Sequence, residues 1–257
     1  MRVRFPMNAG VIPTNPESVA PSAACGYRRC MAPHFSPELF RFLTELKRHN
    51  DKAWFEKNQE RFENVVRSPA LRFIEEFAGP LNMLSHYFVA EPRKAGGSLF
   101  RIHRDARFSK DKSPYKTNVG IQFRHQAGKD VHAPGFYLHL EPEDCFIGVG
   151  IWHPDTPTTN RIRKAIAEEP AAWKKAAYNK PFAAVFELVG DSLKRTPRPY
   201  DDSHPAALDL RRKDFIAGAS LTEAQVCSPT FLSHYAENVA KAAPLMAYLC
   251  RALGLPY

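Results

Sequence analysis

The densest group of residues with chemical potential lies in residues 101–117, which read RIHRDARFSKDKSPYKT. Arginine presents a planar fork of donors to a phosphate or carboxylate, and lysine adds a mobile positive charge. The segment has two acids, Asp105 and Asp111, and hydroxyl donors at Ser109, Ser113, Tyr115 and Thr117. Its cations outnumber the acids: Arg101, Arg104, Arg107, Lys110, Lys112 and Lys116. This composition predicts a site for a small anionic ligand, although a solvated, salt-bridged surface explains many charge runs.

A second polar group would share the face of the predicted sheet that points away from the core. Alternation places these residues on it: Arg101, His103, Asp105, Gln122, Tyr137, His139 and Trp152. Gly148 and Gly150 would leave space there for a ligand or for packed backbone. A wet face of an antiparallel sheet is the alternative explanation, and we weigh the two about equally.

These two groups define the predicted site. His103 or Asp105 is the predicted acid/base group. Arg163 joins the ligand-binding set because it lies near the start of its predicted helix, where a positive charge opposes the macrodipole. The predicted ligand-binding residues are Arg101, Arg104, Arg107, Lys110, Tyr115, Lys116, His139, Trp152 and Arg163. We assign no metal ligands and no cofactor, and the sequence leaves open whether the ligand is also a substrate.

Two further predictions concern the basic segment. Alternation aims Arg104 at the core beside Ile102, where an unpaired guanidinium is costly, so Arg104 should pair with an acid such as Asp105, Asp111 or a helix carboxylate, or turn outward at a bulge. The rings of Phe108 and Tyr115 should be largely buried, which favours a pocket over an open groove for stacking bases.

The elements that position these residues follow from hydrophobic period and capping signals. Ser36-Pro37, Asn50-Asp51 and Ser68-Pro69 predict the starts of three helices. From Ser98 to Trp152 the period changes to two. Alternating strands are predicted at 119–123, 136–140 and 147–151, with Phe100 and Ile102 directed into the core.

After Trp152 the helical period returns and continues through Leu188. A short strand is predicted near 215–219, and closing helices at 231–241 and 245–253. The fold class is therefore α+β: an antiparallel β-meander with helices packed on one face, N-terminal helices before the sheet and C-terminal helices after it.

Composition limits the class of protein. The 257 residues are 44% hydrophobic and 25% charged, with a net charge of +9, so an anionic partner is permitted. Five scattered cysteines argue against a disulfide framework, and no stretch is long and apolar enough to span a membrane. A cytoplasmic protein with no membrane partner is expected. No dinucleotide or phosphate-binding glycine loop and no H-E-x-x-H motif occurs.

Residues 1–31 differ from the rest of the chain. Four prolines interrupt every potential helix, and no hydrophobic period is found. We interpret them as a disordered extension or, alternatively, as sequence before a true start at Met31; a transit peptide is the third reading. Residues 32–257 are predicted to form a single α+β domain.

The basic segment and the motifs around it resemble those of a known protein family. The run R-x-x-R-D-x-R-F-S-K-D-K-x-P-Y-K-T follows N-D-K-A-W-F-E-K-N and precedes G-F-Y-L-H-L, G-x-G-x-W and I-R-K-A-I. This series resembles the family called domain of unknown function 2461, from about Phe35 to the C-terminus. The resemblance implies one α+β domain with a shared basic motif, and it implies no reaction.

Three functional hypotheses follow. The leading one is a protein that binds a small anionic or phosphorylated ligand where residues 101–117 meet the polar sheet face. The second is a nucleic-acid-binding protein in which the same cations contact phosphates while Phe108, Tyr115 or Trp152 stack bases; it ranks lower because no nucleic-acid motif is found. The third is a structural or protein-interaction module without a ligand.

Overall fold

Strands form where apolar and polar side chains alternate, as the sequence predicts. The computed structural model describes residues 32–105, 107, 109–128 and 133–257. It contains a five-stranded antiparallel sheet in the order β1-β2-β3-β5-β4. The strands are β1 (Val119–Arg124), β2 (Gly135–Leu140), β3 (Cys145–Ile151), β4 (Glu187–Val189) and β5 (Phe215–Leu221). The predicted meander is β1 to β3, and β5 lies close to its predicted position.

Helices precede the sheet, and their starts only partly follow the predicted signals. They are α1 (Pro37–Arg48), α2 (Lys52–Lys57), α3 (Gln59–Phe62) and α4 (Ser68–Leu84). Asp51 caps α2 by accepting a hydrogen bond from the backbone N–H of Trp54 at 2.9 Å. Ser36 precedes α1 without a side-chain capping bond. Ser68 does not start a separate helix, because the π-helical turn Glu63–Arg67 continues α3 into α4.

The remaining helices follow β3. They are α5 (Thr156–Glu168), α6 (Pro170–Ala177), α7 (Lys180–Ala183), α8 (Ala207–Leu210), α9 (Glu223–Val226), α10 (Phe231–Lys241) and α11 (Ala243–Ala252). The last two confirm the predicted closing helices. One expectation was wrong: Leu188 continues the helical period in sequence, but it lies in β4, which pairs with β5.

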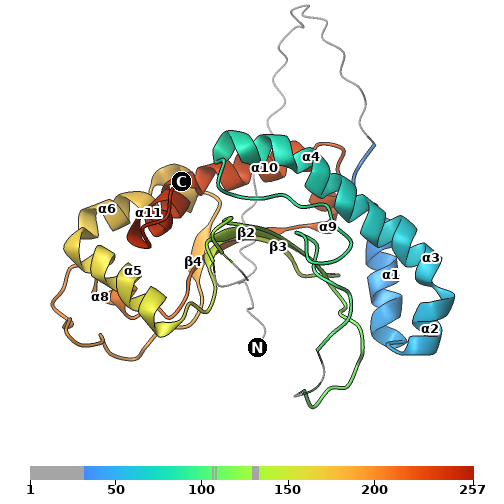
Figure 1. The fold of residues 1–257 in the computed structure, drawn as a ribbon, viewed down its shortest axis with the longest axis horizontal. Helices are drawn as coiled ribbons and strands as arrows, with labels where there is room; N and C mark the ends of the chain where they lie inside the picture. Colours follow the sequence, from blue (N-terminus) through green and yellow to red (C-terminus); the bar gives the residue numbers. More distant parts are fainter. Residues whose placement is uncertain (1–31, 106, 108, 129–132) are drawn as a thin grey trace, which may run out of the picture.

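Helices cover one face of the sheet, and the predicted α+β class is confirmed. Figure 1 shows α4 and α10 across that face, α1 to α3 beyond one end, and α5, α6, α8 and α11 beyond the other. The apolar residues of the meander point toward the covering helices. Phe123 of β1 packs on Phe77 of α4, with ring centroids 4.7 Å apart, and its ring centroid lies 6.2 Å from that of Tyr235 of α10.

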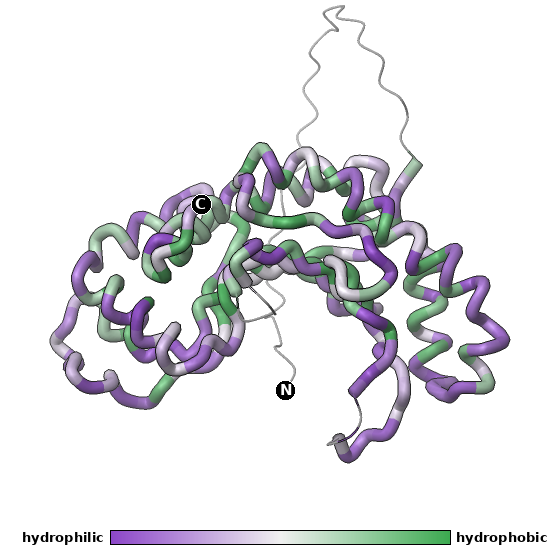
Figure 2. The backbone as a smooth tube through the Cα atoms, in the orientation of Figure 1, coloured by the Kyte–Doolittle hydropathy of each residue, from purple (hydrophilic) through white to green (hydrophobic). Residues whose placement is uncertain are grey.

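The segment between α4 and β1 differs from the predicted strand. Around Leu99 it contacts the sheet through one bridge, to Ile121, and then leaves it. Its two arms pair with each other instead, through a bridge between His103 and Tyr115 and a hydrogen bond of 2.8 Å from Lys116 N to Ile102 O. In Figure 2 the outer part of this segment is strongly hydrophilic. We call residues 101–105 and 114–117 the basic ribbon.

Of two predictions about this region, the structure confirms one and contradicts the other. Ile102 is buried in the core as expected. Phe100 is half-buried and lies on the opposite, polar face of the sheet, where its ring is 5.9 Å from that of Tyr137. The expectation for Phe100 was therefore wrong, because the chain leaves regular strand geometry at this point.

The predicted extension at residues 1–31 lies outside the described residues. Within the described ranges, every helix is too short or too polar to cross a bilayer.

Candidate functional site

The polar sheet face carries a row of side chains from β1 and β2. Register places His139 opposite Gly120 on one side and Phe146 on the other, and Tyr137 opposite Gln122 and Gly148. A Cβ atom at Gly120 would lie 2.7 Å from the Tyr137 hydroxyl and 3.0 Å from the Phe100 ring. Glycine at this position therefore allows both aromatic rings to lie directly over the sheet.

Three of these side chains form a hydrogen-bonded row. The Tyr137 hydroxyl lies 3.1 Å from His139 Nδ1, and His139 Nε2 lies 3.3 Å from Glu141 Oε2. The Glu141 carboxylate can only accept, so in the neutral imidazole Nε2 carries the proton and Nδ1 accepts from the Tyr137 hydroxyl. Burial, and secondarily the charge of Glu141, raise the pKa of Tyr137 above its ordinary value. The row thus holds an oriented histidine beside a buried phenol.

The His139 ring is fixed by stacking as well as by hydrogen bonds to its nitrogens. The Phe146 ring stacks on His139 with centroids 4.6 Å apart and planes at 12°. Stacking and two hydrogen bonds leave the ring little freedom to turn. The ring is therefore oriented and largely buried, unlike a solvated surface side chain.

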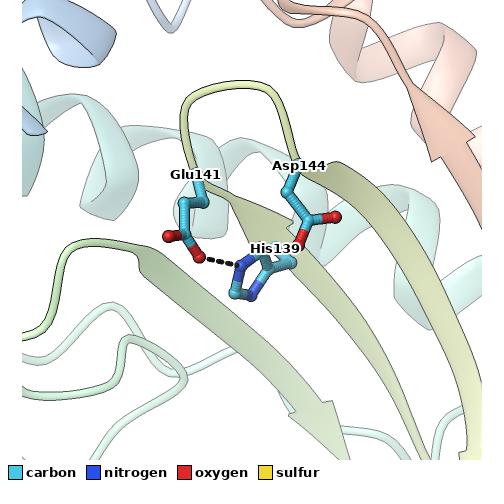
Figure 3. A group of neighbouring side chains, drawn as sticks. All are labelled: His139, Glu141 and Asp144. Atoms are coloured by element: carbon cyan, nitrogen blue, oxygen red, sulfur yellow. Dashed lines mark hydrogen bonds and ion pairs between the residues drawn. The ribbon is translucent and has the colours of Figure 1, made fainter. Parts of the chain in front are cut away.

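A second acid approaches the same histidine. His139, Glu141 and Asp144 each offer one ligand atom, and these atoms all lie within 4.8 Å of one another (Figure 3). Imidazole nitrogen and carboxylate oxygen are both ligands of divalent transition metals. We call these three residues the hairpin cluster, because they surround the turn between β2 and β3.

Two arginines of residues 101–117 are neutralised locally. Arg104 forms an ion pair with Asp111 and donates to Ser109 Oγ at 3.1 Å, so the prediction that it pairs with an acid is confirmed. Arg107 binds Asp105 with an N–O distance of 2.7 Å. Arg107 also lowers the pKa of the Asp105 carboxyl to about 2. Asp105 is therefore ionised and paired at neutral pH, which makes it a poor proton acceptor.

Arg101 and Lys116 differ from Arg104 and Arg107 in their surroundings. Antiparallel pairing of the ribbon arms brings them close together, and neither forms an ion pair with any residue that the structure describes. The Lys116 ammonium lies 5.3 Å from the centroid of the Phe100 ring. Burial, and secondarily repulsion from Arg101, lower the pKa of Lys116. Within the described residues, these two neighbouring cations thus have no ion-pair partner, and Lys116 lies over the Phe100 ring.

The other predicted residues of the 101–117 segment have different surroundings. Tyr115 is 6% exposed and stacks on Phe55, with centroids 4.1 Å apart, so the prediction that this ring is buried is confirmed. Its backbone N–H and C=O both bind the side chain of Asn50 at 3.0 Å. His103 is exposed on the ribbon rather than on the sheet, and Lys110 is exposed. Phe108 lies outside the described residues.

Trp152 and Arg163 are not brought to this cluster. Phe146 lies near the start of β3, and Trp152 follows the end of the same strand, roughly 20 Å from Phe146. Trp152 is 41% exposed. Arg163 lies in α5, beyond the opposite end of the sheet from the ribbon (Figure 1), and donates to the backbone oxygen of Arg212 at 2.8 Å. Gly150, expected to make space, accommodates the backbone of Phe215, since a Cβ there would lie 2.1 Å from Phe215 O.

Sequence reasoning missed Glu141 and Asp144 as site residues. Glu141 continues the face of His139 because residues two apart in an extended chain point the same way. Asp144 returns through the turn, where Asp144 N binds Glu141 O at 3.0 Å. The spacing H-x-E-x-x-D across the end of a predicted strand was the available signal.

The fold and this polar face define an α+β protein whose sheet presents an oriented histidine and two acids, with two neighbouring cations on the adjoining ribbon. The family model of a conserved hypothetical protein (DUF2461) matches residues 38–248, so the chain belongs to this family. Searches of the curated proteins and of the solved structures gave no match.

Proposed function

We propose that this protein binds a small anionic ligand, of the phosphate or carboxylate class, between Arg101, Lys116 and the Tyr137–His139 row. The observation that carries the proposal is a pair of neighbouring cations that form no ion pair with any residue the structure describes. A positive charge that is partly buried and repelled by a neighbour raises the free energy of the folded protein unless an anion compensates it.

The ion pairs within the segment favour Arg101 and Lys116, rather than all of its cations, as the anion-binding residues. Asp111 and Asp105 bind Arg104 and Arg107, respectively. The two acids of the segment therefore pair near its outer end, and Arg101 and Lys116 are the cations at the end that meets the sheet. An anion placed there could also reach hydrogen-bonding groups on the row formed by Tyr137 and His139.

The buried Tyr115 ring favours a small ligand over a nucleic acid. Base stacking requires an exposed ring beside a positive groove, whereas Tyr115 is buried and stacks on Phe55 of α2. Trp152 is exposed, but it lies at the other end of the sheet from Arg101 and Lys116. Nucleic-acid binding therefore remains the second hypothesis.

Calorimetric titration of the full chain with inorganic phosphate, pyrophosphate, phosphate monoesters and citrate tests the proposal. We expect at least one of these anions to bind, and the Arg101→Gln/Lys116→Gln variant to lose that binding. Lys110→Gln is the matched control, because it removes an exposed cation from the same segment and should retain affinity.

Two results would overturn the proposal. One is that none of these anions binds; the other is that Lys110→Gln weakens binding as much as the double variant. A third result would favour the nucleic-acid hypothesis instead: a single-stranded oligonucleotide binds, and its affinity falls with salt concentration with a logarithmic slope that corresponds to several neutralised phosphates.

A further inference from the structure

The turn between β2 and β3 brings three metal-ligating groups together. β2 ends at Leu140 and β3 begins at Cys145, so the connection is residues 141–144. Glu143 adopts a left-handed backbone, with φ of 67°, which turns the chain back sharply. As a result Asp144 lies beside the carboxylate and imidazole that end β2 (Figure 3).

The surroundings of this cluster are unusual for acidic side chains. Only 9% of the Glu141 side chain and 14% of the His139 side chain are exposed. Asp144 forms no ion pair within the part of the chain that the structure describes. The cluster therefore combines a buried carboxylate, a largely buried imidazole and a partly exposed second carboxylate.

The histidine is already oriented for coordination. Its Nε2 atom faces the Glu141 carboxylate, and its Nδ1 atom faces the Tyr137 hydroxyl. If Nε2 binds a cation, the proton of the neutral imidazole resides on Nδ1 and can be donated to the Tyr137 oxygen. Histidines that bind metals commonly have such a partner on the other nitrogen, which fixes the tautomer.

We propose that His139, Glu141 and Asp144 bind one divalent transition-metal ion of the Zn²⁺ or Mn²⁺ class. One imidazole and two carboxylates favour these ions over Ca²⁺ and Mg²⁺, which prefer oxygen ligands. Three protein ligands leave at least one coordination position for water or for a ligand. The inference depends on the hairpin cluster alone and goes beyond the proposed binding of an anion at Arg101 and Lys116.

Metal titration of the full chain after chelator treatment tests this inference. We expect calorimetry to give one site for Zn²⁺ or Mn²⁺, and Co²⁺ to produce an absorption spectrum of a protein-bound ion. Asp144→Asn and Glu141→Gln should each weaken binding by more than the roughly 10–100-fold that follows loss of a residue that merely orients a ligand.

Glu143→Gln is the matched control, since this exposed acid lies in the same turn but outside the cluster. It should leave affinity and stoichiometry unchanged. Absence of a 1:1 site in the wild-type chain would overturn the inference. The same conclusion would follow if Asp144→Asn kept full affinity, or if Glu143→Gln lost as much as Asp144→Asn. Circular dichroism of each variant shows that the loss does not come from unfolding.

The anion and metal proposals can fail separately. Anion binding is measured in the presence of chelator, whereas metal binding is measured in the Arg101→Gln/Lys116→Gln variant as well as in the wild type. A chain that binds phosphate but no metal disproves the metal inference alone, and a chain that binds metal but no anion disproves the proposed function alone.

Discussion

His153 Nδ1 lies 2.9 Å from Oδ1 of Asp214, a carboxylate whose side chain is 2% exposed. The same carboxylate accepts the backbone N–H groups of His153 and Asp191 at 2.8 Å and 2.9 Å. Gly190 makes this approach possible, because a Cβ atom there would lie 2.6 Å from the Asp214 Cβ. Asp214 therefore ties the end of β3 to the end of β4.

We expect Asp214→Ala to destabilise the protein substantially. The change leaves backbone donors without an acceptor, at a cost of about 1–3 kcal/mol for each that stays buried. Urea denaturation of the variant measures the loss. Asp202→Ala removes a solvent-exposed carboxylate and should have a much smaller effect. Equal stability of the two variants would show that Asp214 does not hold these loops together.

The Asp105 carboxyl provides a pH prediction. Hydrogen bonds from Arg107 lower its pKa from 3.8 to about 2 in the folded protein. The ion pair therefore contributes stability above pH 3.8 that is lost as the pH falls through about 2. In Arg107→Ala we expect the pKa, followed by carboxyl carbon NMR shifts, to return toward 3.8. Arg93→Ala, which removes an exposed arginine elsewhere, should leave it at about 2.

Much of the fold could be predicted from the sequence because its signals are local. Alternation in 119–123, 136–140 and 147–151 identifies the strands, and Tyr137 and His139 then share a face by parity alone. The β4 strand escaped prediction because three residues are too few to show a period. The ribbon also escaped, because its arms pair with each other through contacts that alternation does not encode.

The site was predicted in part for the same reason. Arg101, Lys116 and His139 follow from residue type and parity, whereas Asp144 reaches His139 only through the turn at Glu143. Arg163 could not be placed from the sequence, because its partner is a backbone oxygen about fifty residues away. Only the tertiary structure shows that its guanidinium contributes to packing of α5 and not to the basic ribbon.

His34 predicts how stability changes in mild acid. The residue is buried, and burial lowers its pKa below 6.5 although Glu76, at 2.8 Å, partly opposes the shift. The unfolded chain therefore binds the proton first as the pH falls, so the free energy of unfolding should decrease below pH 6.5 and level off only below the lowered pKa. Urea titrations at pH 7.5 and pH 5 measure this difference.

His34→Phe should make the free energy of unfolding less dependent on pH across this range, because phenylalanine keeps the edge contact with Phe73 and does not titrate. His86→Gln is the matched control, since His86 is exposed at the end of α4. If both variants retain the full pH dependence, burial of His34 is not its source.

Lys116 should contribute to binding and not to stability. Its charge is half-buried and repelled by Arg101, while the contact with Phe100 is worth only about 0.5–1 kcal/mol. Lys116→Met keeps the length of the side chain and removes the charge, so we expect a free energy of unfolding at neutral pH that is unchanged or higher. The same variant should lose binding of whichever anion the wild-type chain takes up. Urea denaturation and calorimetric titration on one preparation measure both effects. A variant that unfolds more easily yet binds the anion normally would show that Lys116 supports the ribbon and does not contact the ligand.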